Sequence, residues 1–81
     1  MSVTVTGDVI ALSGTCLVED AEPLLVALQA DPRRSVDVTG ATRLHLAVVQ
    51  LLLAARPTLI GVPDDPILRD RLLPLLLQVN S

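Results

Sequence analysis

Residues 35–55 read SVDVTGATRLHLAVVQLLLAA, a β-prone segment that runs into a long apolar one. Residues 35–38 are predicted to form a strand, and Gly40 is expected to end it. Residues 42–55 hold ten apolar side chains without an internal glycine or proline, and this length favours a helix over a strand. A strand that leads directly into a helix is typical of α/β proteins.

Short β-prone runs and apolar helices continue on both sides of this segment. Gly7 and Asp8 separate two β segments and predict a hairpin. Asp20 is the expected N-cap of the first helix, whose apolar stripe is Ala21, Leu24, Leu25 and Leu28. The predicted strands are residues 3–6, 9–12, 35–38 and 58–62, and the predicted helices are residues 20–30, 42–55 and 66–73.

The resulting element order, β-β-α-β-α-β-α, predicts a single α/β domain over residues 1–81. Helical crossovers between the second, third and fourth strands imply parallel pairing with right-handed connections. We therefore expect a mostly parallel four-stranded sheet with an antiparallel first strand. The strand order stays open, and residues 75–81 are either a helical tail or a short fifth strand.

The composition excludes several classes of protein. Apolar residues make up 51% of the chain and aromatic residues 0%, while six arginines face nine acidic residues for a net charge of −3. The high apolar content argues against a disordered chain. A single cysteine argues against a disulfide scaffold, and the excess of acidic residues argues against a nucleic-acid-binding protein. No apolar run could span a bilayer, no leader is visible, and the lone Cys16 fits a reducing compartment, so a cytoplasmic protein is expected.

Few residues could carry chemistry. The four glycines are scattered singly, unlike a phosphate-binding loop, and Cys16 and His45 alone cannot close a metal site. No cofactor, no metal and no catalytic residue are predicted, so the chain is expected not to be an enzyme. The enzymatic alternative is a Cys16–His45 nucleophile pair, for which no orienting acid is identifiable.

The predicted helix over residues 42–55 is apolar on two sides. At about 100° per residue, its core face carries Leu44, Val48, Leu51, Leu52 and Ala55. The opposite face carries Leu46, Ala47, Gln50, Leu53 and Ala54. A surface helix would place charges there, so this face predicts contact with a partner. The alternative is that the third helix or the tail covers it.

Thr39 and Thr42 lie at the predicted start of the same helix, just after a parallel strand. Sites in open α/β sheets gather at the carboxyl ends of strands, and a helix N-terminus favours a phosphate. One of the two threonines is expected to be the N-cap of the helix, and phosphorylation of one of them is the alternative.

Residues 36–53 resemble the central segment of STAS domains, the sulfate-transporter and anti-sigma-factor-antagonist family. The family pattern, roughly V-D-L-S-G-V-T-x-I-D-S-S-G-L-x-x-L-L, aligns without a gap to VDVTGATRLHLAVVQLLL. Residues 12–14 (LSG) resemble the L-x-G that ends the family's second strand, and the element order agrees over residues 3–73. The resemblance implies a minimal STAS-like fold, because the family's last strand and helix have no clear counterpart.

The D-S-S-G tetrad of the family carries the serine that a partner kinase phosphorylates, and its counterpart here is residues 45–48 (HLAV). The phosphoacceptor position is therefore Ala47, which has no hydroxyl. Family members dock protein partners through the start of the second helix. The resemblance and the apolar face together predict a partner-binding set of Arg43, His45, Leu46, Ala47, Gln50 and Leu53.

The expected function is a non-enzymatic protein–protein interaction module in bacterial signalling or regulation, not switched by phosphorylation at Ala47. The resemblance implies a kinase-like anti-sigma factor, a signalling assembly or a transporter complex as partner, and a homodimer is the other option. Nucleic acid and direct membrane insertion are not expected. The alternative is an antagonist whose phosphoacceptor has moved to Thr42 or Thr39, and an aliphatic-ligand or lipid-trafficking accessory subunit is less favoured.

Overall fold

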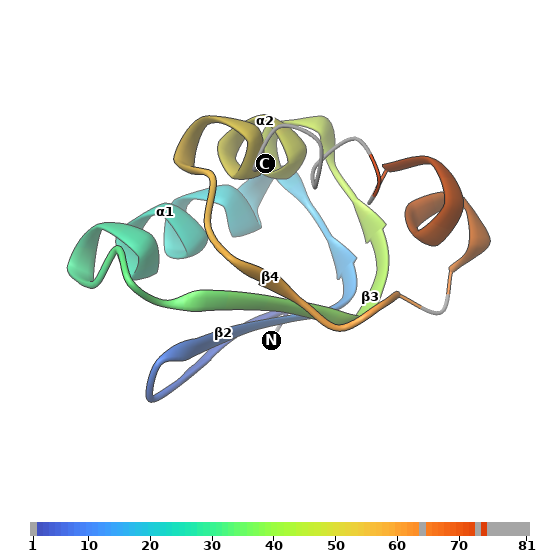
Figure 1. The fold of residues 1–81 in the computed structure, drawn as a ribbon. Coiled ribbons are helices and arrows are strands. Elements are labelled where there is room, and N and C mark those ends of the chain that lie inside the picture. Colours follow the sequence, from blue (N-terminus) through green and yellow to red (C-terminus); the bar gives the residue numbers. More distant parts are fainter. Residues whose placement is uncertain (1, 64, 73, 75–81) are drawn as a thin grey trace.

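The computed structural model describes residues 2–63, 65–72 and 74, and it places two helices on one face of a four-stranded sheet (Figure 1). The strand order is β1-β2-β3-β4; β1 is antiparallel to β2, and the other two pairs are parallel. This confirms the predicted α/β class with a mostly parallel sheet. The elements are β1 (Val3–Thr6), β2 (Val9–Cys16), the 3₁₀ turn η1 (Val18–Asp20), α1 (Ala21–Ala30), β3 (Ser35–Leu44), α2 (Leu46–Ala55), β4 (Leu59–Ile60) and the π-helical turn η2 (Leu68–Leu72).

The N-terminal hairpin forms as predicted, but its second strand is longer than expected. Gly7, with a φ of 58°, supplies the left-handed conformation of the tight turn. The sequence pattern ended this strand at Leu12, whereas β2 continues to Cys16. Its register with β3 shifts between Gly14 and Thr15, so the glycine bends the strand without ending it.

The largest correction concerns the boundary between β3 and α2. Gly40 was expected to end the strand, yet β3 continues to Leu44 and α2 begins at Leu46 instead of residue 42. The physical reason is the pairing with β2: a side chain at Gly40 would come within 3.2 Å of Ser13 Cβ, so a glycine here allows close approach of the two strands.

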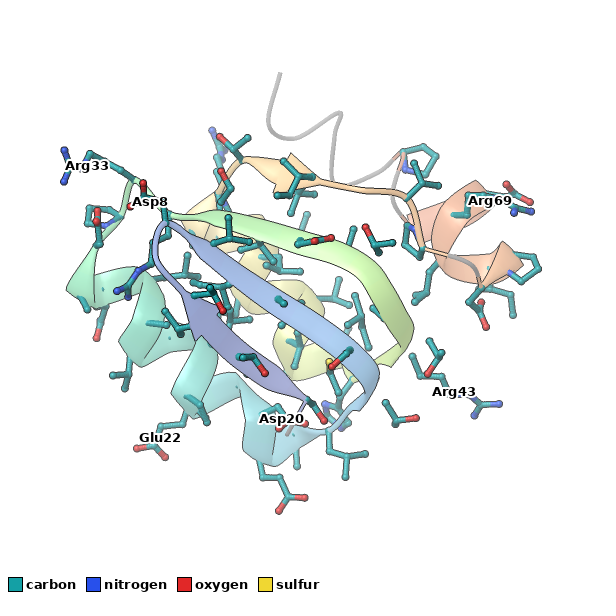
Figure 2. All side chains as sticks on the ribbon, turned by 90° about the horizontal axis from the view of Figure 1, so that it is seen from below. Asp8, Asp20, Glu22, Arg33, Arg43 and Arg69 are labelled. Atoms are coloured by element: carbon teal, nitrogen blue, oxygen red, sulfur yellow. The ribbon has the colours of Figure 1, made fainter. Side chains whose placement is uncertain are left out.

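The core lies between the sheet and the two helices and consists of aliphatic side chains and Cys16. On α2, Val48 and Leu52 are buried as predicted, Val49 joins them, and Ala55 is exposed, contrary to prediction. On α1, the buried residues are Leu24, Ala27 and Leu28, whereas Leu25, which was expected in the stripe, is exposed. Seen from below, α2 lies behind the sheet, α1 projects beyond the edge formed by β1, and the labelled charged side chains lie near the rim (Figure 2).

The strand after α2 is shorter than predicted, and the last helical segment is partly π-helical. β4 covers only Leu59–Ile60 because Gly61, with a φ of 82°, turns the chain away. Residues 66–72 are helical, as expected, and the Asp65 carboxylate caps them by accepting hydrogen bonds from the amides of Ile67 and Leu68 at 2.9 and 3.3 Å. The open prediction for residues 75–81 lies outside the described residues. No helix in the described ranges is long and apolar enough to cross a membrane.

Candidate functional site

The start of α2 is organised by His45, which is the N-cap of the helix. Its backbone is extended, and its Nδ1 atom accepts a hydrogen bond from the Ala47 amide at 3.0 Å. Its own amide donates to the Cys16 carbonyl at 2.8 Å, which ties the helix start to the end of β2. The prediction that Thr39 or Thr42 caps this helix was wrong. β3 extends through both threonines to Leu44, so the helix begins only after them.

We expect His45→Ala to lower the free energy of unfolding by about 0.5–2 kcal/mol, because the Ala47 amide loses its acceptor. His45→Asn is the matched control, since its side-chain oxygen can accept the same bond. Urea titrations followed by far-UV circular dichroism measure both. Equal stability of the alanine variant and the native chain would contradict a capping role.

The predicted partner-binding residues do not all reach the surface. Leu46 is 64% exposed, and Gln50 and Ala54 follow it at one-turn intervals, also exposed. Arg43 is exposed at the end of β3, whereas Ala47 and Leu53 are half-buried, and Leu53 packs against the core. We define the α2 outer stripe as Leu46, Gln50 and Ala54. It contains no charged residue.

Thr39 and Thr42, the alternative phosphoacceptors, lie on β3 with exposed side chains and not at a helix N-terminus. The amide of Thr39 donates to Asp37 Oδ1 at 2.9 Å. Hydrogen bonds from the Thr39 hydroxyl and amide hold the pKa of the Asp37 carboxyl below its usual value. Thr42 and Arg43 line a cavity of about 370 Å³ together with Asp65, Ile67 and Leu68. Because both threonines precede the start of α2, the dipole of that helix does not support a phosphate there as predicted.

The backbones of Cys16 and His45 are joined by the hydrogen bond from the His45 amide to the Cys16 carbonyl, but their side chains have different surroundings. Burial raises the pKa of the Cys16 thiol, and the negative charge of Asp20 raises it further. The thiol lies in the core with no exposed surface, while the ring of His45 caps α2. Within the residues that the structure describes, no group of three or more metal-ligating side chains comes together.

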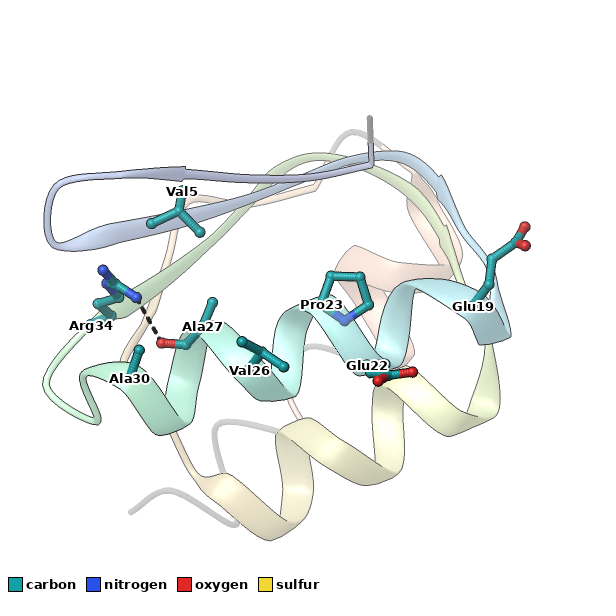
Figure 3. Close-up of a pocket in the computed structure, with 8 residues that line it drawn as sticks. All are labelled: Val5, Glu19, Glu22, Pro23, Val26, Ala27, Ala30 and Arg34. Atoms are coloured by element: carbon teal, nitrogen blue, oxygen red, sulfur yellow. Dashed lines mark hydrogen bonds between the residues drawn. The ribbon is translucent and has the colours of Figure 1, made fainter.

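A second surface feature was not predicted from the sequence. A cleft of about 640 Å³ lies between β1 and α1, and we call it the β1–α1 groove (Figure 3). Its lining residues are Val5, Glu19, Glu22, Pro23, Val26, Ala27, Ala30 and Arg34. Helical periodicity could have predicted that Glu22 and Val26 are exposed on the helix. The groove itself could not be predicted in this way, because β1 and α1 are far apart in sequence.

The β1–α1 groove has opposite charges at its two ends. Arg34 lies at the hairpin end, where its Nη1 donates to the Ala27 carbonyl at 2.8 Å (Figure 3). Its Nε donates to the Gly7 carbonyl at 3.3 Å. Glu19 and Glu22 lie at the other end, beside the start of α1. The middle is apolar, with Val5 above Val26 and Ala27. Such a groove suits an apolar occupant that carries charges at its ends.

Comparison with models of known families, with curated proteins and with solved structures finds no match to this chain. The STAS-like interpretation of residues 36–53 therefore remains a prediction from their sequence alone.

Proposed function

We propose that this protein is a non-enzymatic, STAS-like interaction module that docks a protein partner through Arg43 and the α2 outer stripe. The observation that carries the proposal is Leu46, a leucine 64% exposed in the first turn of a helix. Gln50 and Ala54 continue the same side of α2 without a charge. Exposed apolar surface of this kind is stabilised when a partner removes it from water.

The proposed surface extends from α2 toward the C-terminal turn. Arg43 lines a cavity of about 370 Å³ with Ile67, which is itself 66% exposed. Arginine beside exposed aliphatic groups is a composition enriched at protein interfaces, where the guanidinium binds carboxylates and the aliphatic groups supply apolar area. A partner with an apolar patch next to an acidic side chain would match this surface.

The contact at this surface is proposed to be unswitched. Ala47 occupies the position at which STAS-like relatives are phosphorylated, and it has neither a hydroxyl nor full exposure. Without a dianion in the first turn of α2, release of the partner by charge repulsion at this residue does not occur. The proposed partners are a kinase-like anti-sigma factor, a signalling assembly or a transporter complex of a bacterial cytoplasm.

We expect Leu46→Asp to abolish partner binding and to leave the domain folded. Burying a leucine is worth about 1.5–3 kcal/mol, so its loss together with a buried carboxylate weakens the complex by more than about tenfold. Aspartate in the first helical turn also suits the helix dipole, which keeps the monomer stable. The measurement is co-purification of the tagged chain from its native cells, with the mass of the intact complex and circular dichroism of each variant.

Val62→Asp is the matched control for this experiment. Val62 is 55% exposed in the segment after β4, outside the α2 outer stripe and the β1–α1 groove, so the same change there should leave partner capture intact. Leu53→Asp is not a clean test, because Leu53 packs against the core and its loss would also destabilise the fold. Undiminished capture by Leu46→Asp would refute docking through α2.

Two alternatives have their own tests. A phosphoacceptor at Thr42, which is exposed beside Arg43, requires a mass gain after incubation with the cognate kinase. An enzyme that uses Cys16 requires a thiol that reacts with a disulfide reagent in the native state, whereas a buried, protonated thiol reacts only after unfolding.

A further inference from the structure

The first strand leaves one of its edges open for pairing. In the part of the chain that the structure describes, β1 pairs only with β2 and lies at the edge of the sheet. The Ser13 amide donates to the Ser2 carbonyl at 2.9 Å, which makes Ser2 and Ser13 a hydrogen-bonded pair. Because such pairs alternate along an antiparallel ladder, Thr4 and Thr6 bond to β2. The N–H and C=O groups of Val3 and Val5 therefore point away from β2.

The usual features that protect an edge strand from pairing are missing from β1. Its sequence is Val-Thr-Val-Thr, which has high β propensity and contains no charge, proline or glycine. The pairing of β1 with β2 is regular over all four residues, so no bulge twists the edge away. β4, at the opposite edge, has only two residues. β1 is thus the longer edge strand among the described residues.

The β1–α1 groove opens beside this edge. Among the described residues, Val5 is the only strand residue that lines it, and the other lining residues belong to η1, to α1 or, in the case of Arg34, to the loop after α1. No residue of β2, β3 or α2 contributes to its lining. A strand added next to β1 would therefore cover the groove, and its inward side chains would face Val26 and Ala30.

The charges of the groove fit a second copy of the same chain. The hairpin end carries Arg34, and the opposite end carries Glu19 and Glu22 (Figure 3). A two-fold axis perpendicular to the sheet, placed between the two β1 strands and level with Thr4, reverses the second copy end for end. Arg34 of one copy then faces the glutamates of the other, and this pairing occurs twice. The hydrogen bonds of Arg34 to Gly7 and Ala27 use only two of its five N–H donors.

We propose that two copies of this chain associate through antiparallel pairing of their β1 strands, with Thr4 opposite Thr4 on the two-fold axis. In this register Val3 of one copy is opposite Val5 of the other. The outward N–H and C=O groups of both valines are then satisfied, and the two sheets become one continuous sheet. The threonine side chains meet on the open face of the sheet, where such cross-strand pairs are favourable.

The β1 interface is a different surface from the one that is proposed to dock a protein partner. The α2 outer stripe belongs to the helix next to α1 and contributes nothing to the β1–α1 groove. A dimer through β1 therefore presents two α2 outer stripes, and a single assembly can bind two partners or one symmetric partner. A bivalent arrangement of this kind raises the apparent affinity for a multivalent target without a new contact.

Sedimentation equilibrium of the purified chain tests the proposal. The native chain is expected to approach twice its monomer mass of 8.6 kDa as its concentration rises toward the millimolar range. Val5→Pro removes an outward amide and no bond to β2, so the monomer should fold while the dimer is lost. Thr4→Lys places two ammonium groups on the two-fold axis and should also give a monomer, whereas Thr4→Val should remain dimeric.

The outcomes separate this proposal from docking through α2. Circular dichroism checks that each variant is folded, and if Val5→Pro unfolds, Thr4→Lys decides. A native chain that stays at 8.6 kDa at every concentration overturns the dimer. If Leu46→Asp is monomeric while Val5→Pro and Thr4→Lys stay dimeric, the chain associates through α2, and the β1 interface is overturned. Retained dimerisation of Leu46→Asp, with loss of partner capture, supports both surfaces.

Discussion

Leu52→Ala is expected to remove about 2–5 kcal/mol from the free energy of unfolding, the largest effect of any single change considered for this protein. Leu52 is 1% exposed and lies in the middle of the core between α2 and the sheet. The chain has no aromatic residue, so no large side chain can move into the space that the leucine leaves. Small domains are stabilised by only about 5–15 kcal/mol in total, so a substantial part of that stability would be lost.

Leu46→Ala is the matched control, with the same substitution six residues earlier in the same helix. Its side chain is 64% exposed, so the expected loss is within about 0.5 kcal/mol. Far-UV circular dichroism in urea is the appropriate measurement, because the chain has no tryptophan to report fluorescence. Similar losses for both variants would show that Leu46 is covered in solution and would contradict its assignment to an interaction surface.

Gly61→Ala is expected to destabilise the fold by about 2–4 kcal/mol, and two physical effects contribute. Gly61 has a φ of 82°, a conformation that costs an L-residue about 1–2 kcal/mol. An added Cβ would also overlap Thr39 Oγ1 and lie 2.8 Å from Asp37 Oδ1. Thr39 and Asp37 hydrogen bond to each other, so neither gives way without losing that bond.

Two further variants divide the Gly61 effect into its parts. Gly14→Ala has a similar backbone requirement, with a φ of 66°, but an added Cβ there meets nothing within 4 Å. It should lose only the conformational part, about 1–2 kcal/mol. Combining Gly61→Ala with Thr39→Ala removes the hydroxyl from the overlap and should recover part of the loss. If the double variant loses as much free energy of unfolding as the two single variants lose together, or more, the proposed overlap is wrong.

The proposed interaction surfaces differ in how they could be recognised from the sequence. The apolar stripe of α2 follows from helical periodicity, because residues one turn apart share a face whatever the rest of the fold does. The edge of β1 and the β1–α1 groove depend on the strand order and on the position of α1. Neither is specified by local sequence, since each joins segments separated by a dozen or more residues.

Local patterns of the sequence determined the class and order of the elements. The glycine turn after Val3–Thr6 determines the hairpin, and the uninterrupted apolar run of α2 determines a helix. Asp65, just before Pro66, determines where the last helical segment begins. Each of these depends on residues within one or two turns of one another. Such interactions are the same in any fold, and the predictions that depend on them are confirmed.

The tertiary structure decided where β3 ends, which residue caps α2 and what surrounds the candidate site residues. Gly40 reads locally as a strand end, but close pairing with β2 at Ser13 keeps the strand going to Leu44. That continuation moves Thr39 and Thr42 onto the sheet and gives the cap to His45, whose amide is held by the Cys16 carbonyl. Long-range hydrogen bonds between strands outweigh the weak local preference of one glycine, and only the assembled sheet contains those bonds.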